Sequence, residues 1–412
     1  MYCARAAILS TLLLLVIVLS SAVHAQTFSV LHSFTGGTDG GNPWGGLTID
    51  RAGNLYGTAS LGGTHQLGAV FKLSHSQQGW TFNPLYSFTG SPNDGGSPIT
   101  SMVFGPDGTL YGVTSGGGPI GFGTAFNVRP PARICSRVLC PWDETVIHEF
   151  PDPMGVDGFF PTGSPLFDQA GDIYGTTQDG PHGGTCGGNG CGVVYKLTQS
   201  QGSWTESIVY NFNPAPDSNL PQGGLIFDSS GKLYGTACEG GTHNHGTVFQ
   251  MTTSGVENIL YNFRDQSDGQ CPAAALIFDP AGNLYSTASD GGTNGGGTAF
   301  ELMSSNGSWN FVLLYSFAFH ALPSGLTRDS AGNLYGTTYT AGAFGYGAVF
   351  KLTPSQGGWV YTSLHDFTNG PDGANPVSGV VLDGNGNIYG TASQGAQQGC
   401  IFGCGVVWEI TP

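Results

Sequence analysis

One eight-residue phrase, GNLYGTAS at residues 53–60, recurs seven times along the chain with small changes. Its tyrosines are spaced by 55, 63, 60, 51, 50 and 54 residues. They are Tyr56, Tyr111, Tyr174, Tyr234, Tyr285, Tyr335 and Tyr389. A period of this length is typical of folds that stack one small unit many times. The chain is therefore expected to form a solenoid or a propeller.

Each unit contains four short β-type segments separated by Gly, Asp, Asn and Pro. In the fourth unit they are residues 223–228, 232–237, 246–251 and 258–263, and we name them A, B, C and D in every unit. Four antiparallel strands repeated around an axis make the blades of a propeller. We predict an all-β fold, a seven-bladed β-propeller of four-stranded antiparallel blades.

The two ends of the chain carry complementary fragments of this unit. The last unit has segments A, B and C but no D, whereas residues 27–34 match D and have no A, B or C before them. Pairing the two fragments would close the ring and hide the strand edges of an open sheet. We predict that residues 27–34 form the outer strand of the last blade, within a single domain of residues 26–412.

The repeated aromatic residues have a packing role in this prediction. Successive side chains of a strand point to opposite faces, so a small residue is needed where a large one arrives from the next blade. We expect each repeated tyrosine to lie over a glycine of a neighbouring blade. The tryptophans that follow the C–D turns are expected to be structural residues at the rim: Trp80, Trp204, Trp309 and Trp359.

The first 25 residues have the features of a secretory signal peptide, with Arg5 before an apolar run and a small-residue cleavage site that ends at Ala25. The predicted mature chain is secreted or periplasmic and monomeric. No other run is apolar enough for a transmembrane segment. An excess of 27 acidic over 11 basic residues argues against nucleic acid as a partner.

Eight cysteines remain once Cys3 is removed with this segment. An even number in an exported chain indicates disulfides. Three predicted pairs are close in sequence and the fourth joins two repeats: Cys135–Cys140, Cys186–Cys191, Cys400–Cys404 and Cys238–Cys271. Zinc is the alternative, but no C-x-x-C spacing occurs.

The run D-x-x-G-N-L-Y-G-T … G-T-V-F-K-L-T, closed by L-Y-S-F, resembles the Gloeo/Verruco (GloVer) tandem-repeat family of exported bacterial proteins. The resemblance covers nearly the whole mature chain. It implies an exported bacterial propeller with no established activity. Members of this family often carry a C-terminal sorting anchor, and this chain shows none, which argues against attachment to the cell surface.

In a propeller whose strand A is innermost, the B–C and D–A connections emerge on one face and the A–B and C–D connections on the other. The A–B turns are short and uniform, whereas the B–C loops vary, which is typical of a binding face. Four histidines of the B–C loops are candidates for binding: His65, His182, His243 and His245.

Five of the seven D–A connections on this face contain the motif D-G-x-x-P, and unit six lacks its aspartate. Its aspartates are Asp39, Asp94, Asp157, Asp268 and Asp372, with a variant at Asp217. One interpretation is an Asx-type turn that leads into strand A. The other is a ring of carboxylates around the pore mouth that binds Ca²⁺, which favours several oxygen ligands.

His243 and His245 could both ligate another divalent metal if their segment is extended, although a polar loop tip also explains them. No nucleophile, zinc-protease or nucleotide-binding motif occurs, and we predict no catalytic residue. Residues 129–144 form an inserted C–D loop, interpreted as a docking site for a partner or as a tolerated insertion.

These observations predict a non-catalytic, exported propeller that binds a glycan or a protein on the B–C/D–A face. A divalent-metal-dependent lyase or glycan hydrolase on the same face is the first alternative. A purely structural surface protein is the second.

Overall fold

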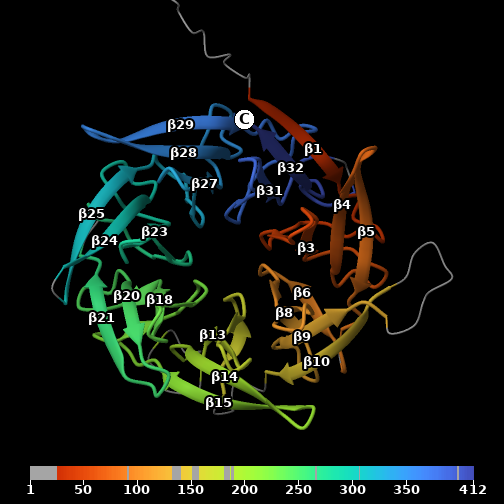
Figure 1. Cartoon of the computed structure of the whole chain (residues 1–412), viewed down its shortest axis with the longest axis horizontal. Coiled ribbons are helices and arrows are strands. Elements are labelled where there is room, and N and C mark those ends of the chain that lie inside the picture. Colours follow the sequence, from red (N-terminus) through yellow and green to blue (C-terminus); the bar gives the residue numbers. More distant parts are fainter. Residues whose placement is uncertain are drawn as a thin grey trace, which may run out of the picture.

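The computed structural model describes most of the chain, namely residues 26–90, 92–131, 141–150, 157–180, 186, 190–264, 267–305, 307–396 and 399–412. These residues form seven blades of antiparallel β-sheet arranged in a closed ring (Figure 1). The seven-bladed propeller predicted from the repeat is therefore confirmed. Within these ranges the molecule has no helix long and apolar enough for a membrane crossing.

The main strands of each blade run from the innermost, A, to the outermost, D. Blade 1 contains β2 (Thr48–Ile49), β3 (Leu55–Ala59), β4 (Ala69–Ser76) and β5 (Gly79–Ser87). Blade 2 contains β7 (Val103–Phe104), β8 (Leu110–Gly117), β9 (Thr124–Arg129) and β10 (Asp143–Glu149). Blade 3 contains β12 (Leu166–Phe167), β13 (Ile173–Asp179), β14 (Val193–Ser200) and β15 (Ser203–Asn211). Blade 4 contains β17 (Ile226–Phe227), β18 (Leu233–Ala237), β20 (Thr247–Met251) and β21 (Glu257–Asn262).

The remaining three blades follow the same order. Blade 5 contains β22 (Ile277–Phe278), β23 (Leu284–Ala288), β24 (Thr298–Ser305) and β25 (Ser308–Ser316). Blade 6 contains β26 (Thr327–Arg328), β27 (Leu334–Thr338), β28 (Ala348–Ser355) and β29 (Gly358–Asp366). Blade 7 contains β30 (Val381–Leu382), β31 (Ile388–Ala392), β32 (Val406–Thr411) and β1 (Thr27–Ser33).

The ring is closed by the pairing of its two ends. Strand β1 lies antiparallel to β32, with Thr27 opposite Thr411 and Ser33 opposite Val406. The sheet order β1-β32-β31-β30 completes blade 7 with the N-terminal strand. The segment before Gln26, which is the predicted signal peptide, lies outside the described residues.

The inner edge of the ring is held by threonine hydroxyls rather than by long A strands, which pair over two residues each. The threonine two residues after the repeated tyrosine of strand B donates its Oγ1 proton to a backbone carbonyl of the next blade. In blade 5, Thr287 donates to Ser324 O at 2.9 Å, and in blade 7, Thr391 donates to Gly45 O at 3.4 Å. Blade 2 has Val113 at this position. This threonine of strand B therefore links neighbouring blades at the inner edge of the ring.

The expected contact between each tyrosine and a glycine of the neighbouring blade is wrong. The repeated glycine makes room within its own blade, because a Cβ at Gly57 would lie 2.5 Å from Cζ of Phe71, its cross-strand partner. The tyrosine instead packs on aromatic rings of the next blade, as Tyr56 does on Phe104 and Trp142. Cross-strand pairs lie closer together than strands of adjacent blades, so the large residue that needs space is the paired one.

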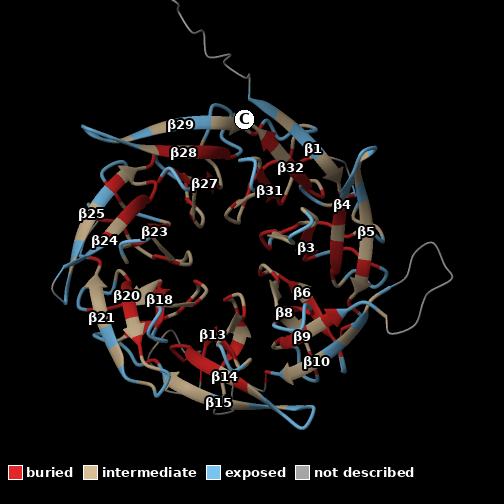
Figure 2. Cartoon of the chain, viewed as in Figure 1, coloured by how far each residue is buried: buried red, intermediate tan, exposed pale blue. Residues whose placement is uncertain are grey.

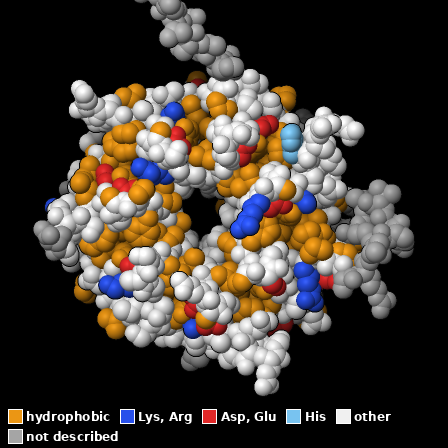
Figure 3. Space-filling model, viewed as in Figure 1, with side chains coloured by type: hydrophobic (Ala, Val, Ile, Leu, Met, Phe, Trp, Pro, Cys, Tyr) orange, Lys and Arg blue, Asp and Glu red, His pale blue; other side chains and the backbone are white. Residues whose placement is uncertain are grey.

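The core lies between blades, on both faces of strands B and C. These strands are buried, whereas the outermost strands are partly exposed (Figure 2). The rim tryptophans contribute to this core. Trp309 of blade 5, for example, lies 6.2 Å from Tyr234 of blade 4, ring centre to ring centre. The space-filling view shows an opening at the centre of the ring (Figure 3).

Candidate functional site

The B–C and D–A connections lie together on one face, which we call the loop face. Each D–A connection pairs with a B–C loop. Strand β6 (Gly95–Pro98) pairs with the end of β8, β11 (Phe159–Pro161) with the end of β13, and β16 (Ser218–Asn219) with β19 (Glu239–Gly240). Elsewhere isolated bridges join the same segments. The variable loops are thus anchored on a second layer of short ladders.

The aspartate of the D-G-x-x-P motif binds strand D of the preceding blade. Asp39 accepts hydrogen bonds from the backbone N and Oγ1 of Thr35 and lies 3.1 Å from Nε2 of His32. Asp372 has the same relation to Thr368 and His365. In the tyrosine-bearing blades a tyrosine hydroxyl replaces the histidine, as between Tyr86 and Asp94 at 2.8 Å. Tyr261 likewise donates to Asp268 at 2.5 Å.

The proline of the motif has an equally local role. The residue before it adopts a left-handed backbone in all seven blades, with φ between 49° and 55°. The proline ring then covers a glycine of the preceding blade, because a Cβ at Gly68 would lie 2.6 Å from Cδ of Pro98. The contacts of aspartate and proline therefore match the turn interpretation of this motif.

Four of these aspartates accept a hydrogen bond from a backbone N of their own turn, next to the outermost strand of the preceding blade: Asp39, Asp94, Asp268 and Asp372. Asp157 lies at the start of the connection into blade 3, and burial together with the Asp157 carboxylate raises the pKa of Glu206 to about 8. Across the described ranges, no three His, Cys, Asp or Glu side chains gather in a way that could hold a metal ion.

The candidate histidines occupy separate places. His65 is exposed on the B–C loop of blade 1, with Nδ1 2.9 Å from the hydroxyl of Thr64. His243 is exposed on the B–C loop of blade 4, and the backbone carbonyl of His245 accepts a hydrogen bond from Cys271 N at 3.0 Å. His182 lies outside the described residues. The structure thus brings His243 and His245 onto one loop without a third ligand group beside them in the described residues.

Three disulfides stiffen the loop face, and they are pairs predicted from the sequence. Two close single B–C loops, Cys186–Cys191 in blade 3 and Cys400–Cys404 in blade 7. The third, Cys238–Cys271, joins the B–C loop of blade 4 to the D–A connection that enters blade 5. Cys135 and Cys140 lie outside the described residues, as does most of the inserted loop at 129–144.

Exposed apolar side chains are concentrated on the loop face. Of the 13 large hydrophobic residues that are exposed in the described part, eight lie in B–C or D–A connections. We call them the apolar arc: Trp44, Leu61, Ile120, Phe319, Phe344, Tyr346, Ile401 and Phe402. They come from five consecutive blades, 5, 6, 7, 1 and 2. Ile401 is 92% exposed and Phe319 70%, although folding normally removes such side chains from water.

The centre of the ring offers different chemistry. The segments that lead into the A strands are built from small, uncharged residues, such as Gly45-Gly46 in blade 1, Gly223-Gly224 in blade 4 and Ala274-Ala275 in blade 5. Their neighbours around the ring are in direct contact, since a Cβ at Gly46 would lie 2.5 Å from Oγ of Ser101. These segments carry no acid, base or cation for chemistry at the axis.

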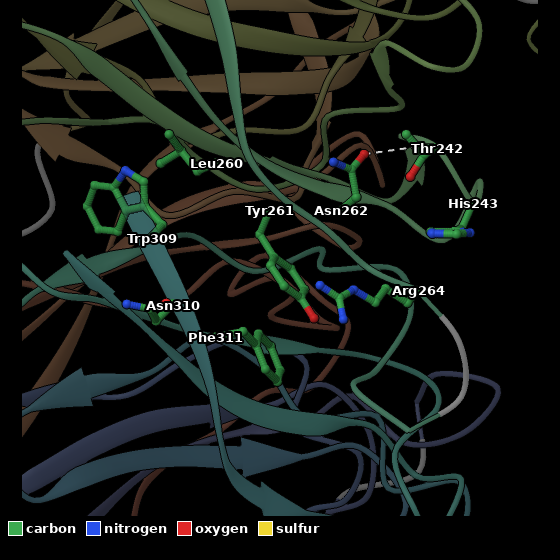
Figure 4. A pocket seen from close by; sticks show the side chains of 9 residues that line it. All are labelled: Thr242, His243, Leu260, Tyr261, Asn262, Arg264, Trp309, Asn310 and Phe311. Carbon is green, nitrogen blue, oxygen red and sulfur yellow. Dashed lines mark hydrogen bonds between the residues drawn. The ribbon is translucent and has the colours of Figure 1, made fainter. Parts of the chain in front are cut away.

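A groove of about 600 Å³ runs along the outer wall between blades 4 and 5 (Figure 4). His243 lies at its loop-face end and Trp309 at the other, with Tyr261 and Arg264 between them. The lining residues come from a B–C loop, a D–A connection and the two outer strands β21 and β25: Thr242, His243, Leu260, Tyr261, Asn262, Arg264, Trp309, Asn310 and Phe311. The groove therefore joins the loop face to the rim.

The loop face was predictable from the sequence, but the apolar side chains that distinguish it were not predicted. The histidines were predicted as candidates because imidazoles bind metals, whereas the apolar arc is the larger set of exposed groups. A signal was present in the B–C loops, where AGAFGYG and GCIFGC carry large apolar residues in place of the Gly, Thr and His of other loops. Arg264 could also have been singled out from the sequence, since the other blades have Thr, Asn, Ala or Pro at its position.

The closed ring and the paired loops on one face define the molecule as a seven-bladed β-propeller with a loop-built candidate binding face. The Gloeobacter/Verrucomicrobia repeat matches residues 17–146, 141–280 and 274–412. The chain therefore belongs to this repeat family, and the resemblance found in the LYGT phrases is confirmed. No curated protein matches the chain.

Solved structures show similarity to the fold. An ulvan lyase of polysaccharide lyase family PL25, bound to -[GlcA(1-4)Rha3S]-, has a TM-score of 0.57 and 10% identity over 93% of this chain and 95% of that chain. A gluconolactonase from Xanthomonas campestris has a TM-score of 0.37 and 14% identity over 61% of this chain and 71% of that one. At these identities the first similarity shows the propeller fold alone, and the second is too low to show a shared fold or function.

Proposed function

We propose that the protein is an exported binding module that docks a protein partner on the apolar arc of the loop face. The observation that carries this proposal is the concentration of exposed large hydrophobic side chains on that face, eight of 13 in the described part. Exposed apolar clusters of this kind mark interaction surfaces, and aromatic residues are enriched at the centres of interfaces.

Rigid presentation of these side chains supports the proposal. Ile401 and Phe402 lie within the loop closed by the Cys400–Cys404 disulfide. The ring of Phe319 contacts the ring of His320 at 3.8 Å between centres, and it covers Gly295 of the neighbouring B–C loop. A surface held in its bound form loses less conformational entropy on association, which favours affinity.

Photo-crosslinking tests this function in cells that export the protein. A benzophenone amino acid replaces Phe344 or Phe402 of the arc, or Val256 or Val360, which are exposed at 65% and 52% but lie outside the loop face. We expect one discrete adduct of the same mass from both arc positions and none from the two controls. Equal labelling at all four positions, or no labelling at the arc, would contradict the proposal.

The alternative function is a lyase or glycan hydrolase on the same face. The fold similarity to the ulvan lyase favours it, although the substrate named for that lyase belongs to that protein. Release of unsaturated or reducing ends from a polysaccharide by the purified protein would support this alternative. Loss of that activity in a Phe344→Ser and Phe402→Ser double variant would place it on the loop face.

A further inference from the structure

The groove between blades 4 and 5 lies beside an unusually short hairpin. Strands β20 and β21 of blade 4 contain five and six residues, whereas the C and D strands of blades 1, 3, 5 and 6 contain eight and nine. Strand β21 begins at Glu257, which corresponds to Phe311 of blade 5, since each precedes the closing phenylalanine by six residues. Trp309 and Asn310 thus extend beyond the start of β21, at the rim end of the groove.

The side chain of Arg264 does not make the contact that a threonine makes at the same position in three other blades. Thr35, Thr89 and Thr368 occupy this position elsewhere, and each hydroxyl donates to the aspartate of its own turn. In blade 4 the backbone N of Arg264 still donates to Asp268 at 3.2 Å. The guanidinium takes part in no hydrogen bond or ion pair within the described part of the chain. The side chain lines the groove instead (Figure 4).

The rest of the lining combines aromatic rings with side-chain hydrogen-bonding groups. Tyr261 stacks on Phe311 with ring centres 4.6 Å apart and planes inclined by 15°, which fixes the floor of the groove. Trp309 is half-buried and held at one edge by Tyr234. Asn262 accepts a hydrogen bond from Thr242 N at 2.9 Å through Oδ1, so its amide NH₂ group remains available to a ligand.

The shape of the groove selects a chain rather than a small compact molecule. The groove is elongated along the outer strands, from Trp309 at the rim past Tyr261 to His243 on the loop face (Figure 4). A peptide bound along a strand would be recognised mainly by backbone hydrogen bonds, whereas the groups presented here are side-chain rings, amides and hydroxyls. A saccharide matches them, since each sugar has an apolar ring face and a rim of hydroxyls.

We propose that this groove binds an acidic saccharide chain, with a uronate carboxylate on Arg264 and a sugar ring on Trp309. A guanidinium presents a rigid fork of N–H donors that a carboxylate can accept in two parallel hydrogen bonds. The protein carries a formal net charge of −16, so its overall field repels polyanions and affinity must come from this local contact. The site is separate from the apolar arc and does not depend on the function proposed for it.

Calorimetric titration with short oligogalacturonates tests the site, and the same oligosaccharides with their carboxylates reduced to alcohols serve as neutral probes. We expect the acidic probe to bind more tightly than the neutral one. Arg264→Gln should weaken acidic binding at least tenfold, about 1.4 kcal/mol, and leave neutral binding unchanged. Arg51→Gln, which removes the same charge from an exposed A–B turn, should have no effect.

Trp309→Ala tests the sugar contact, with Trp359→Ala as its matched control. Trp359 has the same position in blade 6 and the same contact with a tyrosine of the preceding blade, Tyr285, at 6.4 Å. Both variants should lose similar thermal stability, but Trp309→Ala alone should weaken binding of both probes at least fivefold. Equal binding by wild type and Arg264→Gln, equal affinity for the two probes, or equal loss in both tryptophan variants would overturn the proposal.

Discussion

The seven junctions between blades divide into two groups at one position of strand D, six residues before its closing phenylalanine. At four junctions this residue is aromatic and stacks on a tyrosine or histidine of the preceding blade. The stacked pairs, with ring centres 3.6 to 4.9 Å apart, are Phe28–His365, His32–Phe82, Tyr261–Phe311 and Tyr315–Tyr361. At the three consecutive junctions between blades 1 and 4 the residue is a glutamate: Glu144, Glu206 and Glu257.

Each of these glutamates is expected to remain protonated below about pH 8. Burial comes first and a nearby aspartate second in raising the pKa of Glu144, Glu206 and Glu257 to about 8. Glu257 accepts hydrogen bonds from Ser218 Oγ at 2.6 Å and from Tyr210 OH at 3.3 Å. Glu206 lies 3.4 Å from Nε2 of His148, whose pKa burial lowers to about 4.

The same position of strand D can therefore be filled by an aromatic ring or by a buried carboxyl group. In the aromatic group the ring that fills the space between outer strands carries no titrating group of its own, although at two junctions it stacks on a histidine whose pKa is lowered by burial. In the acidic group a carboxyl fills the same space and must retain a proton to do so, because an isolated buried carboxylate is costly. Three adjacent junctions should therefore make one arc of the ring sensitive to pH.

Replacing an aromatic residue of the first group by glutamate gives the largest expected loss of stability. Phe82→Glu removes the ring that stacks on His32 at 3.8 Å and places a carboxyl among aromatic neighbours. We expect the free energy of unfolding to fall by roughly 4 kcal/mol at pH 8, from lost packing and a poorly solvated charge. At pH 5 the loss should be smaller because the carboxyl can bind a proton. Urea denaturation at both pH values measures it.

Phe82→Leu is the control, since it removes the ring without adding a carboxyl. Any change in its loss between the two pH values reports His32, whose pKa is lowered by burial, and the additional loss of Phe82→Glu at pH 8 reports the carboxylate. A Phe82→Glu variant as stable as Phe82→Leu at pH 8 would mean that the two groups of junctions are interchangeable. In that case the distribution of glutamates around the ring would have no energetic consequence.

Removing one glutamate has the next largest effect. Between pH 4.5 and 8 the folded protein keeps the proton of Glu144, whereas the unfolded chain releases it, so the free energy of unfolding falls as the pH rises through this window. The slope is about 1.36 kcal/mol per pH unit. Between pH 5.5 and 7, wild type should lose roughly 2 kcal/mol more than Glu144→Gln.

Comparison with Glu149→Gln isolates this effect. Glu149 lies on the same strand, β10, but is exposed, so its removal should leave the pH dependence of the wild type unchanged. The opposing contribution of His148, which destabilises the fold as the pH falls below 6.5, is common to all three proteins and cancels. Parallel pH profiles for wild type and Glu144→Gln would show that Glu144 is already ionised in the folded state.

Much of this architecture was visible in the sequence because it is repeated. Seven copies of one phrase fix the number of blades, and the missing segment D of the last unit identifies residues 27–34 as its replacement. Contacts within one unit, such as the aspartate turns, follow from local chemistry. Contacts between units are less predictable: the tyrosines pack on aromatic rings of the next blade rather than on its glycines, because periodicity does not reveal which faces meet.

The candidate site was harder to predict for a related reason. The alternation of Phe and Glu at one position of strand D is readable in the sequence, but its partners, such as Asp94 beside Glu144, come from the preceding blade. The groove depends on the short hairpin of blade 4, whose effect appears only when Trp309 of the next blade is placed beside it. Exposure of Ile401 and Phe402 could not be distinguished from core packing by composition alone.

The threonine hydroxyls at the inner edge of the ring give the smallest expected loss of stability. They also test whether the two groups of junctions differ only at their outer strands. Thr58 donates to Thr100 O at 3.2 Å at an acidic junction, and Thr287 donates to Ser324 O at 2.9 Å at an aromatic one. Because both hydroxyls are buried and satisfy a carbonyl, Thr58→Val and Thr287→Val should each cost about 1 kcal/mol by urea denaturation. The two losses should be equal and should not change between pH 5.5 and 8. A loss at Thr58 that grows with pH would show that strain at Glu144 is transmitted to the inner edge of the blade, and the two groups of junctions would then differ through their whole depth rather than at their outer strands.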